Sequence, residues 1–302
     1  MAGPKLRAFR ERALLRALGI VSFIGRRIPL RRGQAIGRFL GSLAWTFARG
    51  ERRKAMRNIE IAFPEWTDDQ RRRVIRAMFR HLGTSLFEIV WLPNIDELNE
   101  RTRFEGTDRV VDLVRGGRSV VVFTGHCGNW EWLAYSVGKR APVTVLQRER
   151  TERGLGDFIV DIRKQAGIDT IDRGSTAAGR ELIRAMRKPG FVAFLIDQSI
   201  RAESAKVPFF GKPALTPIGP ATLAIRTEAY AVAAFIERLD DGTHLIRFQE
   251  PLETKRGDDP IELTARMTRA IEEQVRRVPE QWVWMHDRWR DRPKWDVGST
   301  AL

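Results

Sequence analysis

Residues 119–131, with the sequence SVVVFTGHCGNWE, combine a predicted strand, a glycine-flanked turn and the start of a helix. The four apolar side chains after Ser119 are typical of a strand that is covered on both faces of a sheet. Gly125 and Gly128 permit a tight turn after this strand, and a helical pattern begins at Trp130. A strand, a turn and a helix in this order indicate an α/β sheet.

The same alternation of strands and helices continues toward the C-terminus. Further strands are expected at 143–146, 191–196, 232–236 and 245–248, and further helices at 157–165, 177–188 and 261–278. Upstream, Thr67 and Gln70 predict a capping box at the start of a helix that includes Ile89. We therefore expect an α/β fold in which a mostly parallel central sheet is flanked by helices.

Positive charge is concentrated at the N-terminus of the chain. Its 302 residues include 53 lysine and arginine residues and 38 acidic residues, which gives a net charge of +15. Fifteen of the basic residues lie within residues 1–57, where Glu11 and Glu51 are the acids. The remainder is nearly neutral, so a nucleic-acid-binding protein with a uniformly basic surface is disfavoured.

Two amphipathic segments lie within this basic arm, residues 1–57. Apolar side chains repeat every three to four residues over 5–24. The second apolar stripe consists of Ile36, Leu40, Leu43 and Phe47. Such helices dock on membranes with the apolar face in the acyl boundary and the arginines on anionic lipid. The alternative is that both stripes pack on the protein's own core.

Neither segment is long enough to cross a bilayer, which takes about 20 consecutive apolar residues. The longest uncharged runs there are 17–25 and 39–48, and Arg26 follows the first without a small-residue cleavage site. We therefore expect no spanning helix and no cleaved signal peptide. The single cysteine, Cys127, excludes a disulfide framework and a cysteine-rich zinc site, and it suits a reducing compartment.

His126 is the candidate for catalysis in the turn after the first strand, because reactive groups of α/β sheets gather beyond the carboxyl ends of strands. Glu131 completes an H-x-x-x-x-E pattern in the first turn of the following helix. It could accept a hydrogen bond from one nitrogen of the imidazole, and the other nitrogen could then act as a general base toward a hydroxyl group. A histidine with only a structural role is the alternative.

Asp197 and Gln198 follow the predicted strand 191–196 in the same way, so we expect them to line the same cleft. Patterns for other chemistries are incomplete. The chain has no G-x-S-x-G nucleophile elbow, no full dinucleotide or Walker fingerprint, and no zinc-ligand spacing among its histidines. Cys127 is a weaker nucleophile candidate. Its thiol would need activation by the adjacent His126, and residues adjacent in sequence rarely face each other in a turn.

The motif Gly125-His126-x-Gly128-Asn129-Trp130-Glu131 resembles that of the lipid A late acyltransferase family, which includes the related phosphatidylinositol mannoside acyltransferases. The resemblance covers most of the chain, and further motifs occur in the family's order. They are Arg57-Asn58, Ala62-Phe63-Pro64-Glu65, Arg163 with Gly167, Asp197-Gln198, Val207-Pro208-Phe209-Phe210-Gly211, Gly219-Pro220-Ala221 with Arg226-Thr227, and Pro279-Glu280-Gln281-Trp282-x-Trp284-x-His286. Gln165 replaces a frequent basic residue and Cys127 a larger apolar one, and neither departure affects His126 or Glu131.

The resemblance implies a fold similar to that of glycerol-3-phosphate acyltransferases. It implies transfer of a fatty acyl chain from a thioester, on acyl carrier protein or coenzyme A, to a hydroxyl group of a glycolipid such as a lipid A precursor. It also implies His126 as the base, Glu131 as its partner, no metal, and no cofactor besides the thioester co-substrate. A phosphatidylinositol mannoside or another glycolipid or phospholipid as acceptor is the alternative. Other classes are a basic nucleic-acid-binding protein and a non-catalytic lipid-binding relative.

From these arguments we expect a basic membrane-docking arm at 1–57, an α/β acyltransferase domain at 58–290 and a loose tail at 291–302. The expected location is peripheral, on the anionic cytoplasmic face of a bacterial inner membrane, with no nucleic-acid partner.

We expect Asn129 to contribute to substrate binding by holding the turn that carries His126. Arg148, Arg163 and Arg173 are expected to bind phosphate groups of the donor or the glycolipid, because a guanidinium matches phosphate geometry. The alternative for these three residues is an ordinary surface arginine.

Overall fold

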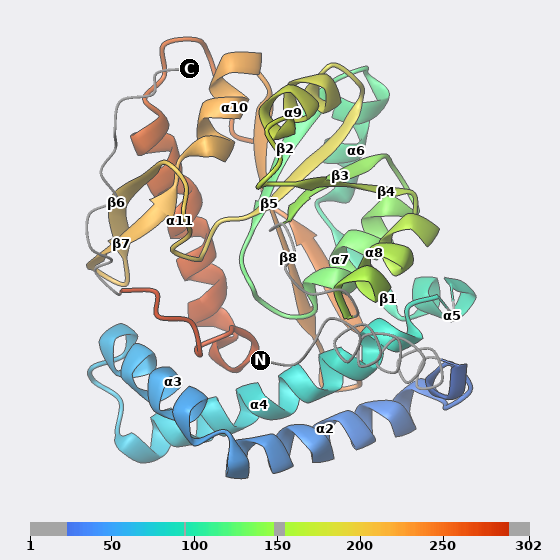
Figure 1. Ribbon diagram of the computed structural model, residues 1–302, viewed down its shortest axis with the longest axis vertical. Helices are drawn as coiled ribbons and strands as arrows, with labels where there is room; N and C mark the ends of the chain where they lie inside the picture. Colours follow the sequence, from blue (N-terminus) through green and yellow to red (C-terminus); the bar gives the residue numbers. More distant parts are fainter. Residues whose placement is uncertain (1–22, 94, 148–154, 290–302) are drawn as a thin grey trace, which may run out of the picture.

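The computed structural model describes residues 23–93, 95–147 and 155–289, and a seven-stranded sheet lies at its centre (Figure 1). The strand order is β1-β9-β8-β2-β5-β3-β4, and every neighbouring pair is parallel except β8 with β9. The predicted α/β fold with a mostly parallel central sheet flanked by helices is confirmed.

Each strand and helix expected from the sequence within the described residues corresponds to an element of this fold. The sheet strands are β1 (Thr102–Glu105), β2 (Ser119–Thr124), β3 (Val143–Gln147), β4 (Ile168–Asp172), β5 (Gly190–Leu195), β8 (Tyr230–Arg238) and β9 (His244–Phe248). The helices are α2 (Leu30–Phe47), α3 (Arg49–Ala62), α4 (Asp68–Trp91), α5 (Ile95–Glu100), α6 (Thr107–Arg115), α7 (Trp130–Gly138), α8 (Leu155–Gln165), α9 (Ala178–Met186), α10 (Gly219–Thr227) and α11 (Pro260–Arg277). A separate hairpin consists of β6 (Ser204–Phe209) and β7 (Lys212–Pro217), and a short 3-10 helix spans Pro279–Gln281.

The alternation of side chains along β2 divides the core into two layers. Val121 and Phe123 pack with α9, α10 and α11 on one face of the sheet. Val120 and Val122 pack with α6, α7 and α8 on the other face. Successive side chains of a strand point to opposite faces, so a strand covered on both faces requires an unbroken apolar run.

The antiparallel helices α2 and α4 lie across the end of the sheet where β2 and β8 finish (Figure 1). The predicted capping box at the start of α4 is confirmed, because Thr67 and Gln70 each bond the other's backbone N–H. Glycines let α2 approach α4 closely. A Cβ on Gly37 would lie 2.5 Å from the Gly83 carbonyl oxygen, and one on Gly41 would lie 2.2 Å from that of Phe79.

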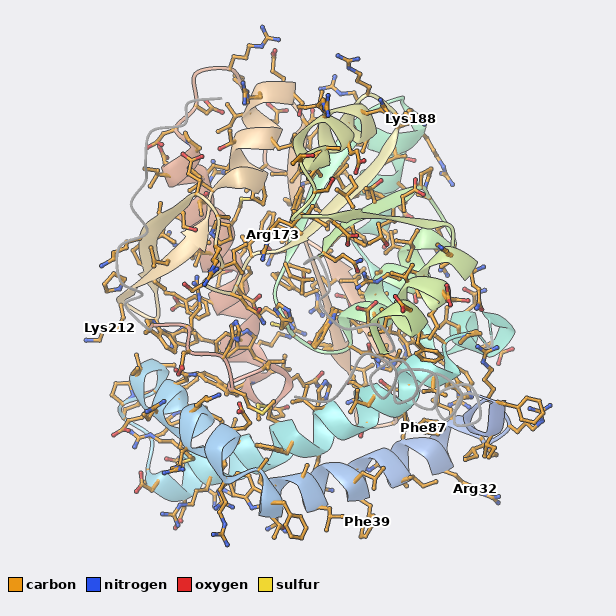
Figure 2. The ribbon with its side chains drawn as sticks, viewed as in Figure 1. Arg32, Phe39, Phe87, Arg173, Lys188 and Lys212 are labelled. Carbon is orange, nitrogen blue, oxygen red and sulfur yellow. The ribbon has the colours of Figure 1, made fainter. Side chains whose placement is uncertain are left out.

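Because its glycine face is buried, α2 turns its apolar stripe outward. The exposed stripe consists of Ile36, Phe39, Leu40, Leu43 and Phe47. Phe39 is 67% exposed and projects away from α4 (Figure 2). The alternative that this stripe packs on the protein's own core is therefore wrong. The first predicted stripe, over 5–24, lies almost entirely outside the described residues.

In the described part of the chain, no helix combines the length and the hydrophobicity that crossing a bilayer requires. The expected boundary between residues 57 and 58 falls inside α3, so one continuous helix joins the arm to the body. The expected tail at 291–302 lies outside the described residues.

Candidate active site

His126 and Asp197 meet because their strands are neighbours. β2 and β5 pair in parallel with Thr124 opposite Leu195, so the residues two positions beyond these ends lie side by side. His126 and Asp197 occupy those two positions. The two loops predicted from the sequence as the place of chemistry therefore form one site at the carboxyl edge of the sheet.

Asp197 is the hydrogen-bond partner of His126. Nδ1 of the imidazole lies 2.7 Å from Asp197 Oδ1, and the backbone N–H of His126 donates to Oδ2 at 2.7 Å. Trp282 Nε1 also donates to Oδ2, at 2.7 Å. The side chain of His126 is 19% exposed and that of Asp197 is 2% exposed. The imidazole is therefore accessible from solvent, and the carboxylate behind it is buried.

The surroundings of Asp197 keep its carboxyl group ionised. Burial alone would raise the pKa of Asp197, but the charge of His126 and the hydrogen bonds from His126 and Trp282 outweigh burial and hold this pKa well below its usual range. An ionised carboxylate can only accept hydrogen bonds, so Nδ1 of His126 carries the proton between them. Nε2 is then the basic nitrogen of the neutral ring, and it accepts from the side-chain amide of Gln198 at 3.2 Å.

The turn before α7 is fixed by close backbone contacts. Gly128 has a positive φ of 61°, and a Cβ there would lie 2.1 Å from the Ile236 carbonyl oxygen, so the position requires glycine. Gly128 N donates to Gln281 O at 2.8 Å, and Val283 N donates to His126 O at 3.2 Å. The segment that follows α11 therefore holds the turn in place.

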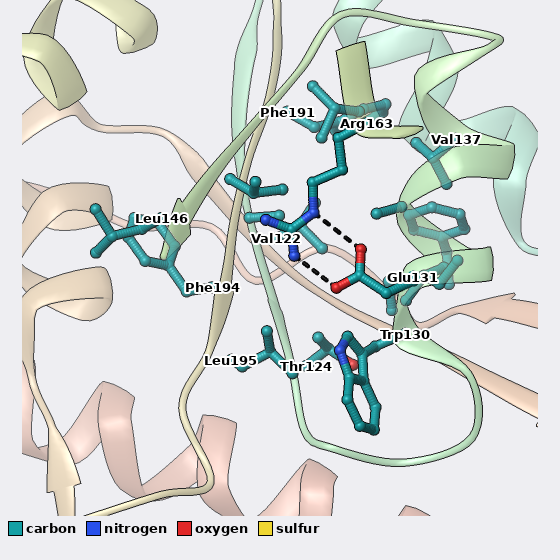
Figure 3. Close-up of a pocket in the computed structure, with 17 residues that line it drawn as sticks. Val122, Thr124, Trp130, Glu131, Val137, Leu146, Arg163, Phe191, Phe194 and Leu195 are labelled. Carbon is teal, nitrogen blue, oxygen red and sulfur yellow. Dashed lines mark hydrogen bonds and ion pairs between the residues drawn. The ribbon is translucent and has the colours of Figure 1, made fainter. Parts of the chain in front are cut away.

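The predicted hydrogen bond between His126 and Glu131 is wrong, because Glu131 forms an ion pair with Arg163. Nε and Nη2 of Arg163 donate to the two carboxylate oxygens at 2.9 and 2.6 Å (Figure 3). Glu131 lies in the first turn of α7, where its side chain reaches α8 instead of the loop after β5. Its catalytic role, implied by the family resemblance, stays a prediction.

An apolar pocket lies beside this ion pair, between α7 and the sheet (Figure 3). Side chains of β2, β3, β5 and β8 form one wall of the pocket. The polar residues that line the pocket are Thr124, Glu131 and Arg163. Trp130 also lines the pocket, and its ring lies 5.0 Å from the imidazole of His126 in an edge-to-face contact. The pocket therefore begins next to the candidate base.

Asn129 is buried and holds the turn, as predicted. Its Oδ1 accepts from Trp132 N at 3.1 Å and so caps α7, and its Nδ2 donates to Glu88 at 2.9 Å. Both ends of the side chain are thus occupied within the protein. The predicted part of Asn129 in substrate binding stays a prediction.

The three predicted phosphate-binding arginines have different surroundings. Arg163 directs its guanidinium to Glu131 and to Gln147, at 3.0 Å from the latter, and not to an open anion site. Arg173 follows β4 and is half-buried. Arg148 lies outside the described residues. Phosphate binding by these arginines stays a prediction.

Two residues of this site were not predicted from the sequence. Trp282, which donates to Asp197, and Gln281, which accepts from Gly128, both lie in the C-terminal motif that carried the resemblance. The indole of Trp282 was an available signal, since a buried indole N–H usually finds a partner. Gln281 accepts through its backbone carbonyl, which the sequence does not mark. Burial also raises the pKa of Cys127 far above its usual value, so this thiol is not activated.

Among residues 23–93, 95–147 and 155–289, no three histidine, cysteine or acidic side chains are grouped so that they could bind a metal ion.

Comparison with known proteins gives one family and several relatives. The sequence profile of the family described as bacterial lipid A biosynthesis acyltransferase matches residues 5–291. A lipid A biosynthesis palmitoleoyltransferase of Escherichia coli K12 is 26% identical over 271 residues, which cover 88% of this chain and 87% of the relative. A lipid A biosynthesis lauroyltransferase of the same strain is 26% identical over 265 residues, 86% of this chain and 85% of the relative. A phosphatidylinositol mannoside acyltransferase of Mycobacterium tuberculosis H37Rv is 26% identical over 163 residues, 51% of each chain.

Proposed function

The chain belongs to the bacterial lipid A biosynthesis acyltransferase family and is an acyltransferase, and we propose that it transfers a fatty acyl chain from a thioester to a hydroxyl group of a membrane glycolipid. The observation that carries this proposal is the His126–Asp197 pair, whose accessible imidazole lies beside an apolar pocket. Such a transfer needs a base for the hydroxyl proton and an apolar site for the acyl chain, and these two features supply them.

In the proposed reaction, Nε2 of His126 takes the proton from the acceptor hydroxyl while the hydroxyl oxygen attacks the thioester carbonyl carbon. The carbon–sulfur bond then breaks, the proton on Nε2 passes to the departing thiolate, and an ester and a free thiol are released. Asp197 holds the Nδ1–H tautomer and stabilises the imidazolium while it keeps its own charge. The amide of Gln198 leaves Nε2 when the hydroxyl arrives.

The apolar pocket beside Trp130 is the proposed entry site for the acyl chain of the donor, because its lining is mostly apolar. Acyl carrier protein and coenzyme A are both proposed carriers, because each presents a long chain as a thioester. Ala134 lies on α7 in the pocket wall, and A134F would shorten the space for the chain. We therefore expect A134F to shift the preferred thioester toward shorter acyl chains, measured by competition between lauroyl and palmitoleoyl donors.

The acceptor is proposed to be a lipid A precursor, with a phosphatidylinositol mannoside as the second candidate because relatives carry both names. The test pairs lauroyl and palmitoleoyl thioesters of both carriers with each acceptor in vesicles. In parallel, mass spectrometry compares the membrane lipids of cells with and without the protein. One added acyl chain on a glycolipid is expected with the unmodified protein and none with His126→Asn. No acylated glycolipid in any combination, with folded protein, would overturn the proposal.

We propose that the protein docks peripherally on the cytoplasmic face of a bacterial inner membrane through the outward face of α2. Its exposed apolar stripe is accompanied on the same helix by the exposed Arg31, Arg32 and Arg38. Apolar side chains flanked by arginines are what binding to an anionic bilayer requires. Since the turn with His126 lies behind α4, this orientation brings the site close to the lipid surface.

The docking test uses a double variant, Phe39→Ser/Leu43→Ser. Its control is Ile261→Ser on α11, which removes an apolar side chain of similar exposure from another part of the surface. Binding to vesicles that contain anionic phosphatidylglycerol should weaken by at least about tenfold in the double variant, because burying one such side chain contributes about 1.5–3 kcal/mol. Ile261→Ser should bind like the unmodified protein. Equal binding by all three proteins would refute docking through α2.

A further inference from the structure

A second polar cluster lies directly behind the turn that carries His126, and the reaction described above does not use it. At its centre is Glu88 of α4, whose side chain is fully buried. Nε and Nη2 of Arg238 donate to the Glu88 carboxylate at 2.8 and 2.6 Å. Gln34 of α2 and Asn129 of the turn also donate to it, at 2.8 and 2.9 Å. The carboxylate thus joins α2, α4, the end of β8 and the active-site turn.

The charge of Glu88 is maintained in spite of its burial. Burial alone would raise the pKa of Glu88, but the guanidinium of Arg238 and the neighbouring His244 outweigh burial and hold this pKa well below its usual range. A buried carboxylate that accepts several directed hydrogen bonds fixes the positions of its donors.

Both residues that follow Cys127 in the turn depend on this cluster. Asn129 binds Glu88 directly and also caps α7. Gly128 donates to the backbone of Gln281, and the side chain of Gln281 forms two hydrogen bonds of 2.9 Å with the backbone of Arg238. Two separate routes therefore run from the Glu88–Arg238 ion pair to the turn.

From this arrangement we propose that Glu88 is a positioning residue for acyl transfer, which acts through Asn129 to hold the imidazole of His126 against Asp197. The inference rests on the proposed function, in which His126 is the base. A misplacement of about 1 Å in a reacting group can cost about 10²-fold in rate, so a residue that fixes the turn influences turnover without contacting the substrate. The same carboxylate also holds Gln34, which ties the proposed membrane-docking helix to the turn.

The experiment breaks the hydrogen bond between Glu88 and Asn129 from each end. Glu88→Gln removes the charge and keeps the shape. Asn129→Ser keeps an oxygen that can cap α7 but removes the amide that donates to Glu88. Val275→Ala, in the buried face of α11, is the matched control for a general loss of stability. Turnover is measured as thiol release from lauroyl-coenzyme A or lauroyl-acyl carrier protein with a lipid A precursor in vesicles, well below the melting temperature of every variant.

We expect kcat to fall by about 10- to 100-fold in E88Q and in N129S, with the KM for the thioester unchanged, and V275A to keep its kcat. Because both changes cut the same link, the double variant E88Q/N129S should be no slower than the slower single variant by more than about threefold, as expected for coupled positions. If E88Q does not fold, N129S against V275A carries the test alone.

A kcat of wild-type size in N129S, or losses that multiply in the double variant, would overturn the role of Glu88. His126→Asn in the same assay separates this outcome from failure of the proposed function. If His126→Asn is inactive and N129S is fully active, only the positioning role fails. If His126→Asn retains turnover, the proposed function itself fails.

Discussion

Asp197 and Glu131 both lie near the turn that carries His126, and their partners differ. Asp197 faces an imidazole, which can gain and lose a proton, whereas Glu131 faces the guanidinium of Arg163, which keeps its charge at every working pH. The first pair can take part in proton transfer, and the second is a fixed ion pair in the pocket wall. Glu131 is close to His126 in the sequence and Asp197 is 71 residues away, so proximity along the chain is a poor guide to which carboxylate serves the imidazole.

The largest effect is expected from His126→Asn. The amide can still donate to Asp197 but accepts no proton, so turnover should fall by about 10²–10⁴-fold, the usual contribution of a general base. The melting temperature should stay near that of the unmodified protein. Thiol release from a lauroyl thioester with the glycolipid acceptor measures the loss. If His126→Asn kept turnover within a few-fold of the unmodified protein, His126 would not be the base, and the contrast between Asp197 and Glu131 would lose its meaning.

Replacing each carboxylate by its amide sharpens the contrast. Asp197→Asn removes the charge that stabilises the imidazolium, and kcat should fall by at least about tenfold. Glu131→Gln should lower kcat less, because Glu131 binds Arg163 and not the imidazole. Both variants are compared in one assay at saturating thioester. A greater loss of kcat in E131Q than in D197N would reverse the assignment of partners.

The fixed ion pair should show itself in stability. Glu131→Met leaves the guanidinium of Arg163 without its partner in an apolar pocket, and removing one member of a buried pair costs roughly 3–5 kcal/mol. The double variant with Arg163→Met replaces both charges by apolar side chains and should recover most of that loss. Urea unfolding of the unmodified protein, both single variants and the double variant completes the cycle. Additive losses would show that the two residues act independently.

The smallest effect concerns acid stability. The pKa of Asp197 in the folded protein lies below the value of about 3.9 expected in the unfolded chain. The unfolded state therefore binds this proton first, and Asp197 contributes stability that is present above about pH 4 and is lost as the pH falls toward the folded pKa. The unfolding free energy of D197N should decline less steeply than that of the unmodified protein between about pH 6 and pH 3. Urea midpoints across this range check the slopes, and parallel slopes would contradict the shifted pKa.

Much of the framework was predictable from the sequence because it depends on local pattern. The apolar runs at 120–123 and 191–196 predicted strands, and the polar residues after them marked the loops of the site. The partnership itself was not predictable, because it depends on the pairing of β2 with β5 and on the register that aligns Thr124 with Leu195. Strand order is set by tertiary packing, and the spacing between His126 and Glu131 contains no information about which strands pair.

The outward face of α2 gives a second example. The apolar stripe was recognised, but its amphipathic pattern alone did not decide between core and membrane. Gly33, Gly37 and Gly41 recur every four residues on the opposite side, and this spacing allows another helix to approach closely. Those glycines, read together, were the signal for the buried side of α2, as their close contacts with α4 show.

The most direct test of the central claim is the tautomer of His126 in the neutral protein. The chain has four histidines, so ¹⁵N-histidine labelling gives a simple spectrum, and the His126 signals are those lost in His126→Asn. We predict a proton on Nδ1 and none on Nε2 in the unmodified protein and in E131Q, and loss of this preference in D197N. A proton on Nε2 in the unmodified protein, or a tautomer that responds to E131Q instead of D197N, would contradict the assignment of Asp197 as the partner of His126.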